Sequence, residues 1–261
     1  MSFENLIVDH RGAVSWLYLN REKALNAISL ACMQELRVAL EQLRDRAESR
    51  VLVISGRGRA FCAGADLTGA ADPKPDGSAQ PTFFELAEAM EDVLNHIGKP
   101  VIAAVNGICC GGGLELALMC DFILAADGAK IGDAHANFGA MPGGGASVRL
   151  PRAVGPAMAR YMMFTGELFM AAEMQTAGLV LRTFAAADFE AGVQHTAERI
   201  AEKSPLGLKT MKQLIEDGFD MPLEIALRHE KLVSAAHMRS WDAAEGGRAF
   251  AEKRKPEFRG Y

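Results

Sequence analysis

The sequence predicts an α/β protein that ends in a helical region. Apolar runs typical of buried strands alternate with amphipathic helices along the first part of the chain, which is the pattern of a parallel sheet with helical crossovers. From Asp188 onward the pattern is mostly helical. The 261 residues suffice for one large domain with an appendage, and an apolar fraction of 49% excludes a disordered chain.

The first elements are a strand pair and a helix. Residues 14–19 predict a strand that pairs with residues 6–8 across a turn at residues 11–12. Ser29 is a typical helix N-cap, because apolar residues at helical spacing follow it over residues 30–43.

The middle of the chain continues the alternation. Buried strands are predicted at residues 51–54, 101–105 and 122–124, with a helix at about residues 83–97. Residues 68–81 contain three prolines and predict a mobile surface loop. Such a loop either shapes a neighbouring pocket or is a solvated insertion.

Four helices are predicted in the last part of the chain. They cover about residues 189–203, 205–217, 222–236 and 241–253. We therefore expect a core at residues 1–200 and a helical C-terminal region at residues 201–261.

Composition excludes several function classes. A net charge of −5 without a basic stripe disfavours nucleic-acid binding. Five cysteines without a Cys-x-x-Cys pair indicate free thiols in a reducing compartment, and residues 1–5 lack a secretory signal, so we expect a cytoplasmic protein. The most apolar stretch, residues 101–126, is interrupted by Asn106, Glu115 and Asp121, and is therefore core and not a membrane span.

Glycine is concentrated where chemistry is expected. Ten of the 26 glycines lie between residues 107 and 145. Three glycine-rich turns follow apolar strands, at residues 60–66, 106–115 and 141–145.

The middle turn carries the most information. Gly111, Gly112 and Gly113 precede an apolar helix, so backbone N–H groups at its start can stabilise a developing negative charge. A dinucleotide fingerprint fails because Leu116 occupies the third glycine position, and no Walker Gly-Lys-Ser/Thr follows. Tight packing of helix on sheet remains the structural alternative.

Glu115, in the first turn of this helix, is either a helix-dipole partner or a catalytic acid/base, and the glycine loop favours catalysis.

Six stretches together resemble the enoyl-CoA hydratase/isomerase (crotonase) superfamily. They are Ala63-Gly64-Ala65-Asp66-Leu67 and residues 99–107, 111–117, 142–145, 177–180 and 250–255. The resemblance implies an α/β fold, a crotonase-like spiral of ββα turns with a helical C-terminal region. It also implies that this region builds trimers, commonly paired into hexamers.

The resemblance assigns site residues position by position. Ala63 and Gly112 match the two backbone N–H donors of the oxyanion hole, and Glu115 matches one of two catalytic glutamates. The CoA moiety is expected along Ala63, Gly64, Ala65 and Asp66. Phe250 and Lys253 match residues of the last helix that reach an acyl-CoA site, often in a neighbouring subunit. No metal and no cofactor beyond the CoA of the substrate are expected.

One position departs from the hydratase pattern. The second glutamate falls twenty residues after the first, and His135 stands there. His135 replaces the glutamate as proton shuttle or water ligand, or it signals a different reaction such as thioester or C–C hydrolysis, or it is a non-catalytic pocket residue. Asp133 either orients the imidazole or is a surface turn residue.

The sequence therefore predicts an acyl-CoA enzyme that hydrates a 2-enoyl-CoA to a 3-hydroxyacyl-CoA. In this prediction Glu115 is the acid/base, and Ala63 and Gly112 stabilise the thioester enolate. The alternative is an isomerase or a hydrolase of another acyl-CoA, with His135 as the distinguishing residue. A non-enzymatic relative that binds RNA or a partner protein is disfavoured by Glu115 and the intact glycine loop.

Overall fold

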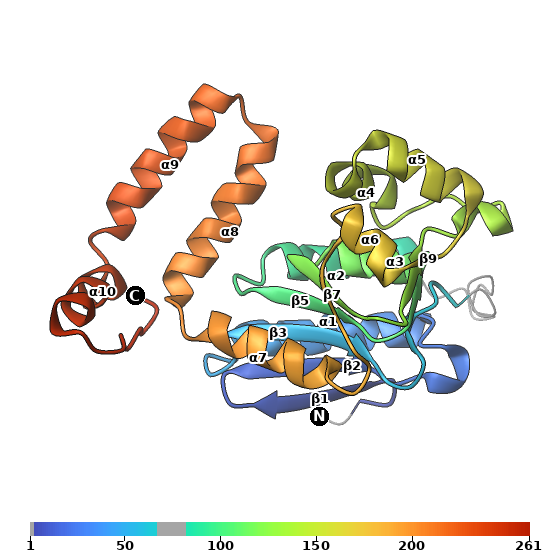
Figure 1. Cartoon of the computed structure of the whole chain (residues 1–261), viewed down its shortest axis with the longest axis horizontal. Helices are drawn as coiled ribbons and strands as arrows, with labels where there is room; N and C mark the ends of the chain where they lie inside the picture. Colours follow the sequence, from blue (N-terminus) through green and yellow to red (C-terminus); the bar gives the residue numbers. More distant parts are fainter. Residues whose placement is uncertain (1–2, 67–81) are drawn as a thin grey trace.

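The computed structural model describes residues 3–66 and 82–261. The predicted loop at residues 68–81 lies outside the described residues. Two sheets form the centre of the molecule, with helices around them and a helical extension at one side (Figure 1).

The larger sheet contains the five strands that the sequence predicts and a sixth, at residues 180–184, that it did not predict. It has six strands in the order β1-β2-β3-β5-β7-β10. Their bounds are Leu6–Arg11, Val14–Leu19, Val51–Gly56, Val101–Val105, Phe122–Ala126 and Val180–Phe184. β1 and β2 form the predicted antiparallel pair, and the remaining pairs are parallel.

A second, smaller sheet takes up parts of two predicted glycine-rich turns, at residues 60–66 and 106–115, and adds two short strands from later in the chain. Its order is β4-β6-β8-β9, with bounds Ala60–Cys62, Ile108–Cys110, Lys130–Gly132 and Phe169–Met170. These strands have two or three residues each, which is too short for a period-2 pattern to be visible.

The two sheets alternate along the chain and confirm the predicted fold class. β3 leads to β4 and then to α2 (Phe83–Asn95), and β5 leads to β6 and then to α3 (Gly112–Leu118). β7 and β8 repeat the step. This repetition is the spiral of ββα turns, and it places the ends of β4, β6 and β8 side by side in one sheet.

Helices cover both faces of the larger sheet. α1 (Leu30–Asp45) begins at Ser29, whose hydroxyl accepts the Cys32 N–H at 3.2 Å, and packs with α2 on one face. α7 (Phe189–Ala201) covers the other face, where Trp16 is fully buried. The shorter helices are η1 (Glu22–Ala24), η2 (His135–Phe138), α4 (Ala146–Val154), α5 (Pro156–Thr165) and α6 (Ala171–Thr176).

The last three helices extend away from the sheets (Figure 1). They are α8 (Pro205–Asp220), α9 (Leu223–His237) and α10 (Trp241–Glu252), close to the predicted ranges. α9 buries none of its residues, and large apolar side chains on α8 and α9 such as Phe219 and Leu232 are exposed. A division of the chain near residue 200 stays a prediction. Over residues 3–66 and 82–261, no helix is long and apolar enough to cross a membrane.

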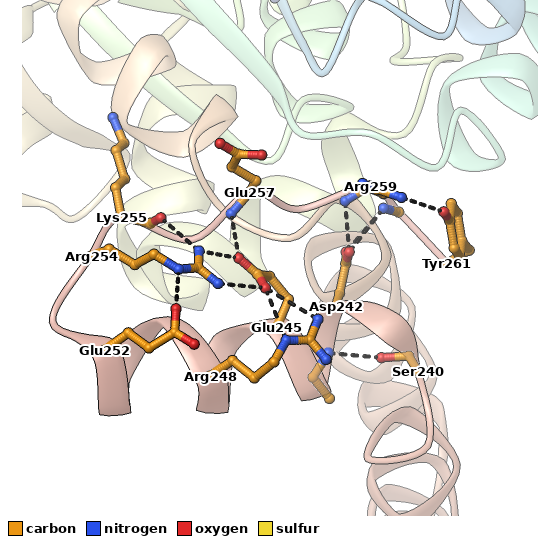
Figure 2. A network of polar contacts seen from close by, with 12 residues as sticks. Ser240, Asp242, Glu245, Arg248, Glu252, Arg254, Lys255, Glu257, Arg259 and Tyr261 are labelled. Carbon is orange, nitrogen blue, oxygen red and sulfur yellow. Dashed lines mark hydrogen bonds and ion pairs between the residues drawn. The ribbon is translucent and has the colours of Figure 1, made fainter.

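A network of charged groups fixes the C-terminal segment on α10 (Figure 2). The Glu245 carboxylate accepts hydrogen bonds from Arg254 at 2.5 Å, Arg248 at 3.2 Å and the Glu257 N–H at 3.0 Å. These bonds, with Arg254 first, lower the pKa of Glu245 to about 2. Asp242 accepts the Arg259 N–H at 2.7 Å. The chain after α10 is therefore held against that helix by ionic and backbone contacts.

Candidate active site

Two glycine-containing turns meet at the ends of β4 and β6. A Cβ added to Gly64, whose φ is +107°, would lie 3.5 Å from the Gly112 nitrogen, and a Cβ added to Gly112 would lie 3.4 Å from the Ala65 nitrogen. The segment from residue 63 to 66 therefore lies against the start of α3. Asp66 at its end is ion-paired with Arg21 at 2.8 Å.

The amide groups of the first turn correct one prediction. The Ala63 N–H donates to the Leu25 carbonyl at 3.0 Å, so the prediction that Ala63 is one of two free donors is wrong. Ala65 instead forms a bridge with Ile28 in which Gly64 accepts and Asp66 donates. This pairing leaves the Ala65 N–H without a backbone acceptor in the part of the chain that the structure describes.

The second available donor is at the start of α3. Gly112 is the first residue of this helix, and the first N–H groups of a helix have no partner within it. Gly111, which precedes it, has φ +54° and donates its own N–H to the Asp133 carbonyl at 2.8 Å. The Ala65 and Gly112 amides thus lie at the contact between the two turns, where a carbonyl oxygen could accept from both.

Glu115 is held beside these amides by the third glycine-rich turn. Its Oε1 accepts the Gly144 N–H at 2.7 Å and the Ala146 N–H at 3.2 Å, and the residue is only 6% exposed. A Cβ on Gly144 would lie 3.0 Å from Oε2 of the same carboxylate, so glycine gives the carboxylate room. Glu115 contacts the start of α4 through Oε1 and leaves Oε2 available.

Oε2 faces His135, and His135 faces Asp133. The distance from His135 Nε2 to Glu115 Oε2 is 3.8 Å, and the distance from His135 Nδ1 to Asp133 Oδ1 is 3.0 Å. The side chains of His135 and Asp133 are 14% and 1% exposed. Asp133 is therefore a buried partner of the imidazole and not a surface turn residue.

An ion pair outside the predicted site supports the loop that holds Glu115. Arg149 of α4 contacts Glu91 of α2 at 2.5 Å and donates to the Gly144 carbonyl at 3.4 Å. Glu91 and Arg149 are separated by 58 residues in sequence, and neither lies in a motif, so sequence reasoning had no signal for them.

The neighbouring thiols have the properties of packing residues. Burial raises the pKa of Cys62 to about 12 and the pKa of Cys109 well above its usual range. Burial, and then the charge of Asp133, raise the pKa of Cys110. Because the thiolate is the nucleophilic form, these cysteines are poor nucleophiles at neutral pH.

Two predicted site residues lie far from Glu115 within one chain. Phe250 is on α10 and is 87% exposed, and Lys253 caps the same helix with φ +53°. α10 and α3 lie at opposite sides of the molecule (Figure 1). Among the residues that are described, no group of three or more His, Cys, Asp or Glu side chains could hold a metal ion.

Comparison with known proteins gives a consistent result. The family model described as enoyl-CoA hydratase/isomerase matches residues 9–261. A crotonyl-CoA hydratase of Syntrophomonas wolfei is 36% identical over 99% of both chains. A 2,3-dehydroadipyl-CoA hydratase of Escherichia coli is 36% identical over 98% of both.

Solved structures agree with the sequence relatives. The crystal structure of an enoyl-CoA hydratase from Bacillus anthracis superposes with a TM-score of 0.91 at 34% identity, covering 99% of this chain and 100% of that one. The crystal structure of an enoyl-CoA hydratase subunit I from Geobacillus kaustophilus gives a TM-score of 0.90 at 36% identity, covering 99% of both chains.

Proposed function

The chain belongs to the enoyl-CoA hydratase/isomerase family, and on that premise we propose that it adds water to a 2-enoyl-CoA to give a 3-hydroxyacyl-CoA. Full-length relatives named as hydratases of crotonyl-CoA and 2,3-dehydroadipyl-CoA support hydration among the reactions of the family.

The observation that carries the proposal is the facing pair of Glu115 Oε2 and His135 Nε2. Their separation of 3.8 Å is too long for a direct hydrogen bond, and it suits one bridging water. A water oxygen about 2.8 Å from each atom makes an angle of about 85° between them, somewhat smaller than the angle between the two O–H bonds of water, which two slightly bent hydrogen bonds accommodate. Both water hydrogens then point to protein acceptors, and an oxygen lone pair is available to the substrate.

The backbone amides complete the reaction. When the water oxygen bonds to the β-carbon, the electrons of the C=C bond move toward the thioester and its carbonyl oxygen gains negative charge. The N–H groups of Ala65 and Gly112 stabilise this enolate. The proton lost by the water goes to the Glu115 and His135 pair, and a proton is returned to the α-carbon as the thioester carbonyl re-forms.

The same proposal covers substrate binding. We propose that the CoA moiety lies along Ala63, Gly64, Ala65 and Asp66, and that no cofactor other than this CoA takes part. We also propose that Phe250 and Lys253 contact the acyl-CoA of a neighbouring copy in a trimer or a dimer of trimers in the cytoplasm. The exposure of Phe250 and the extension of α10 away from the sheets support this arrangement.

Crotonyl-CoA tests the proposal directly. Purified protein is mixed with crotonyl-CoA, and loss of the conjugated-thioester absorbance is followed while a thiol reagent reports free CoA. Hydration predicts loss of absorbance without release of CoA. Equal release of CoA would show thioester hydrolysis, and no reaction with short, long or dicarboxylic enoyl-CoAs would refute hydration.

A further inference from the structure

Asp133 carries a buried carboxylate next to the site, and the hydration step described above assigns it no role. It follows β8 and is 1% exposed. Oδ1 lies 3.0 Å from His135 Nδ1, and Oδ2 accepts the backbone N–H of His135 at 3.4 Å. One carboxylate therefore contacts both the ring and the main chain of the same histidine.

This geometry decides which nitrogen of His135 faces the reaction. A carboxylate is a hydrogen-bond acceptor only, so Nδ1 must carry a proton and donate a hydrogen bond to Asp133. In the neutral ring the other nitrogen is then an acceptor, and Nε2 is the atom that faces Glu115 at 3.8 Å. An imidazole with the opposite tautomer would present an N–H to the water and could not take its proton.

The backbone adopts a costly conformation to make this contact. Ala134, between the two residues, has φ +59°, a left-handed conformation that is unfavourable for a residue with a Cβ. The turn at Ala134 brings the amide and the ring of His135 to the same carboxylate. Such conformations persist where the surrounding structure over-determines them.

The two acceptors of the water are held differently. Oε1 of Glu115 accepts two backbone N–H groups, from Gly144 and Ala146, so a single oxygen of this carboxylate faces the water. A proton on His135 Nε2 would make the ring a cation with Asp133 on one side and Glu115 on the other. Two carboxylates close to an imidazolium stabilise it.

We infer that Asp133 is a positioning residue that makes His135 the group that takes the proton from the attacking water, with Glu115 orienting that water. The inference rests on the proposed function. His135 Nε2 accepts the proton as the water oxygen bonds to the β-carbon, and the C=C electron pair forms the enolate. The imidazolium then gives the same proton to the α-carbon, and the ring returns to its neutral tautomer.

The first experiment needs no substrate, so its failure is separate from failure of the hydration proposal. In protein labelled with ¹⁵N in its six histidines, the His135 signals are assigned with His135→Gln and followed to a pH at which the ring is neutral. The inference predicts a proton on Nδ1 and none on Nε2, and loss of this preference in Asp133→Asn. A wild-type ring with its proton on Nε2 would overturn the inference, whatever any variant does.

The second experiment is a double-mutant cycle on hydration. Asp133→Asn is expected to lower kcat at least about 100-fold with KM changed less than about threefold. Because Asp133 acts through His135, adding Asp133→Asn to His135→Gln is expected to lower kcat no further. Asp127→Asn, an exposed change after β7, is the matched control and is expected to be neutral. Multiplied losses in the double variant, or a kcat of Asp133→Asn within about threefold of wild type, would overturn the inference.

Discussion

Gly112 offers the sharpest test of the two backbone donors, because its neighbour Gly113 provides a matched control. A Cβ on Gly112 would lie 3.4 Å from the Ala65 nitrogen and 3.6 Å from the Gly64 carbonyl carbon, which are ordinary contact distances. Gly112→Ala therefore fits the fold, and its methyl group occupies the space between the two amides where the enolate oxygen is proposed to bind.

Gly112→Ala keeps its backbone N–H, but the added methyl group would block the enolate oxygen from that amide, so the expected magnitude is that of losing one oxyanion donor. Removing such a donor costs about 2.7–4 kcal/mol of activation free energy, which is about 10²–10³-fold in kcat. Stability should change little, because Gly112 has no positive φ and alanine is favoured over glycine in a helix by up to about 1 kcal/mol. Gly112→Ala is thus predicted to be folded and nearly inactive.

Gly113→Ala should fail in the opposite way. Its Cβ would lie 2.1 Å from the Cys62 carbonyl oxygen and 2.8 Å from the Cys62 carbonyl carbon, and both are backbone atoms that cannot rotate away. Overpacking of this kind costs about 1–3 kcal/mol or more. The main effect of Gly113→Ala is therefore predicted on the free energy of unfolding.

Thermal unfolding and crotonyl-CoA hydration, measured on both variants, separate these outcomes. Gly112→Ala is expected to have a Tm close to wild type and a low kcat, whereas Gly113→Ala is expected to have a clearly lowered Tm. A Gly112→Ala protein that keeps more than a third of wild-type kcat would refute the oxyanion role of this amide. An unchanged Tm in Gly113→Ala would refute the packing argument.

Three further predictions concern separate parts of the molecule. Glu115→Gln should keep its fold, because the amide oxygen can replace Oε1 as acceptor, and should lose at least about 100-fold in hydration kcat. The control variant Glu88→Gln, at an exposed position of α2, should have wild-type kcat. An active Glu115→Gln removes that carboxylate from the mechanism. The pKa of Glu245 is lowered from 4.5 to about 2, so the stabilisation by its carboxylate is present above about pH 4.5 and is lost toward pH 2. The Tm difference between wild type and Glu245→Gln should therefore be largest at neutral pH and shrink between about pH 4.5 and pH 2. A Tm difference that does not change with pH contradicts this. Phe250→Ala and Lys253→Ala should raise KM for acyl-CoA with little change in Tm. If these side chains act on a neighbouring copy, either variant should regain activity when it is mixed with Glu115→Gln subunits. No regain of activity in the mixed samples argues for action within one chain.

Local pattern was sufficient for most of the fold. The apolar runs at residues 51–54 and 101–105 are strands, and the N-cap at Ser29 starts a helix, because strand burial and capping depend on residues close in sequence. β4 and β6 were missed because three residues carry no readable period. Their pairing comes from the spiral, which stacks each short strand on the previous one.

The candidate site divides in the same way. Glycines before an apolar helix, with Glu115 in its first turn, indicated where a negative charge could be stabilised and which carboxylate stands beside it. These features are local, and each depends on residue type and short spacing. His135 was identified differently, through the resemblance to the hydratases, as the position that departs from their pattern.

Only the tertiary structure decided which groups are available to a substrate. Ala63 and Ala65 are both alanines of one short turn, but the pairing of this turn with residues 25–28 occupies the Ala63 amide and, among the residues that the structure describes, gives the Ala65 amide no backbone acceptor. Two further features were likewise decided by folding. Asp133 is buried against the imidazole of His135, and Arg149 pairs with Glu91, which lies 58 residues away in sequence. The sequence determines that a residue carries a hydrogen-bonding group, whereas the folded structure determines whether a distant residue already occupies that group.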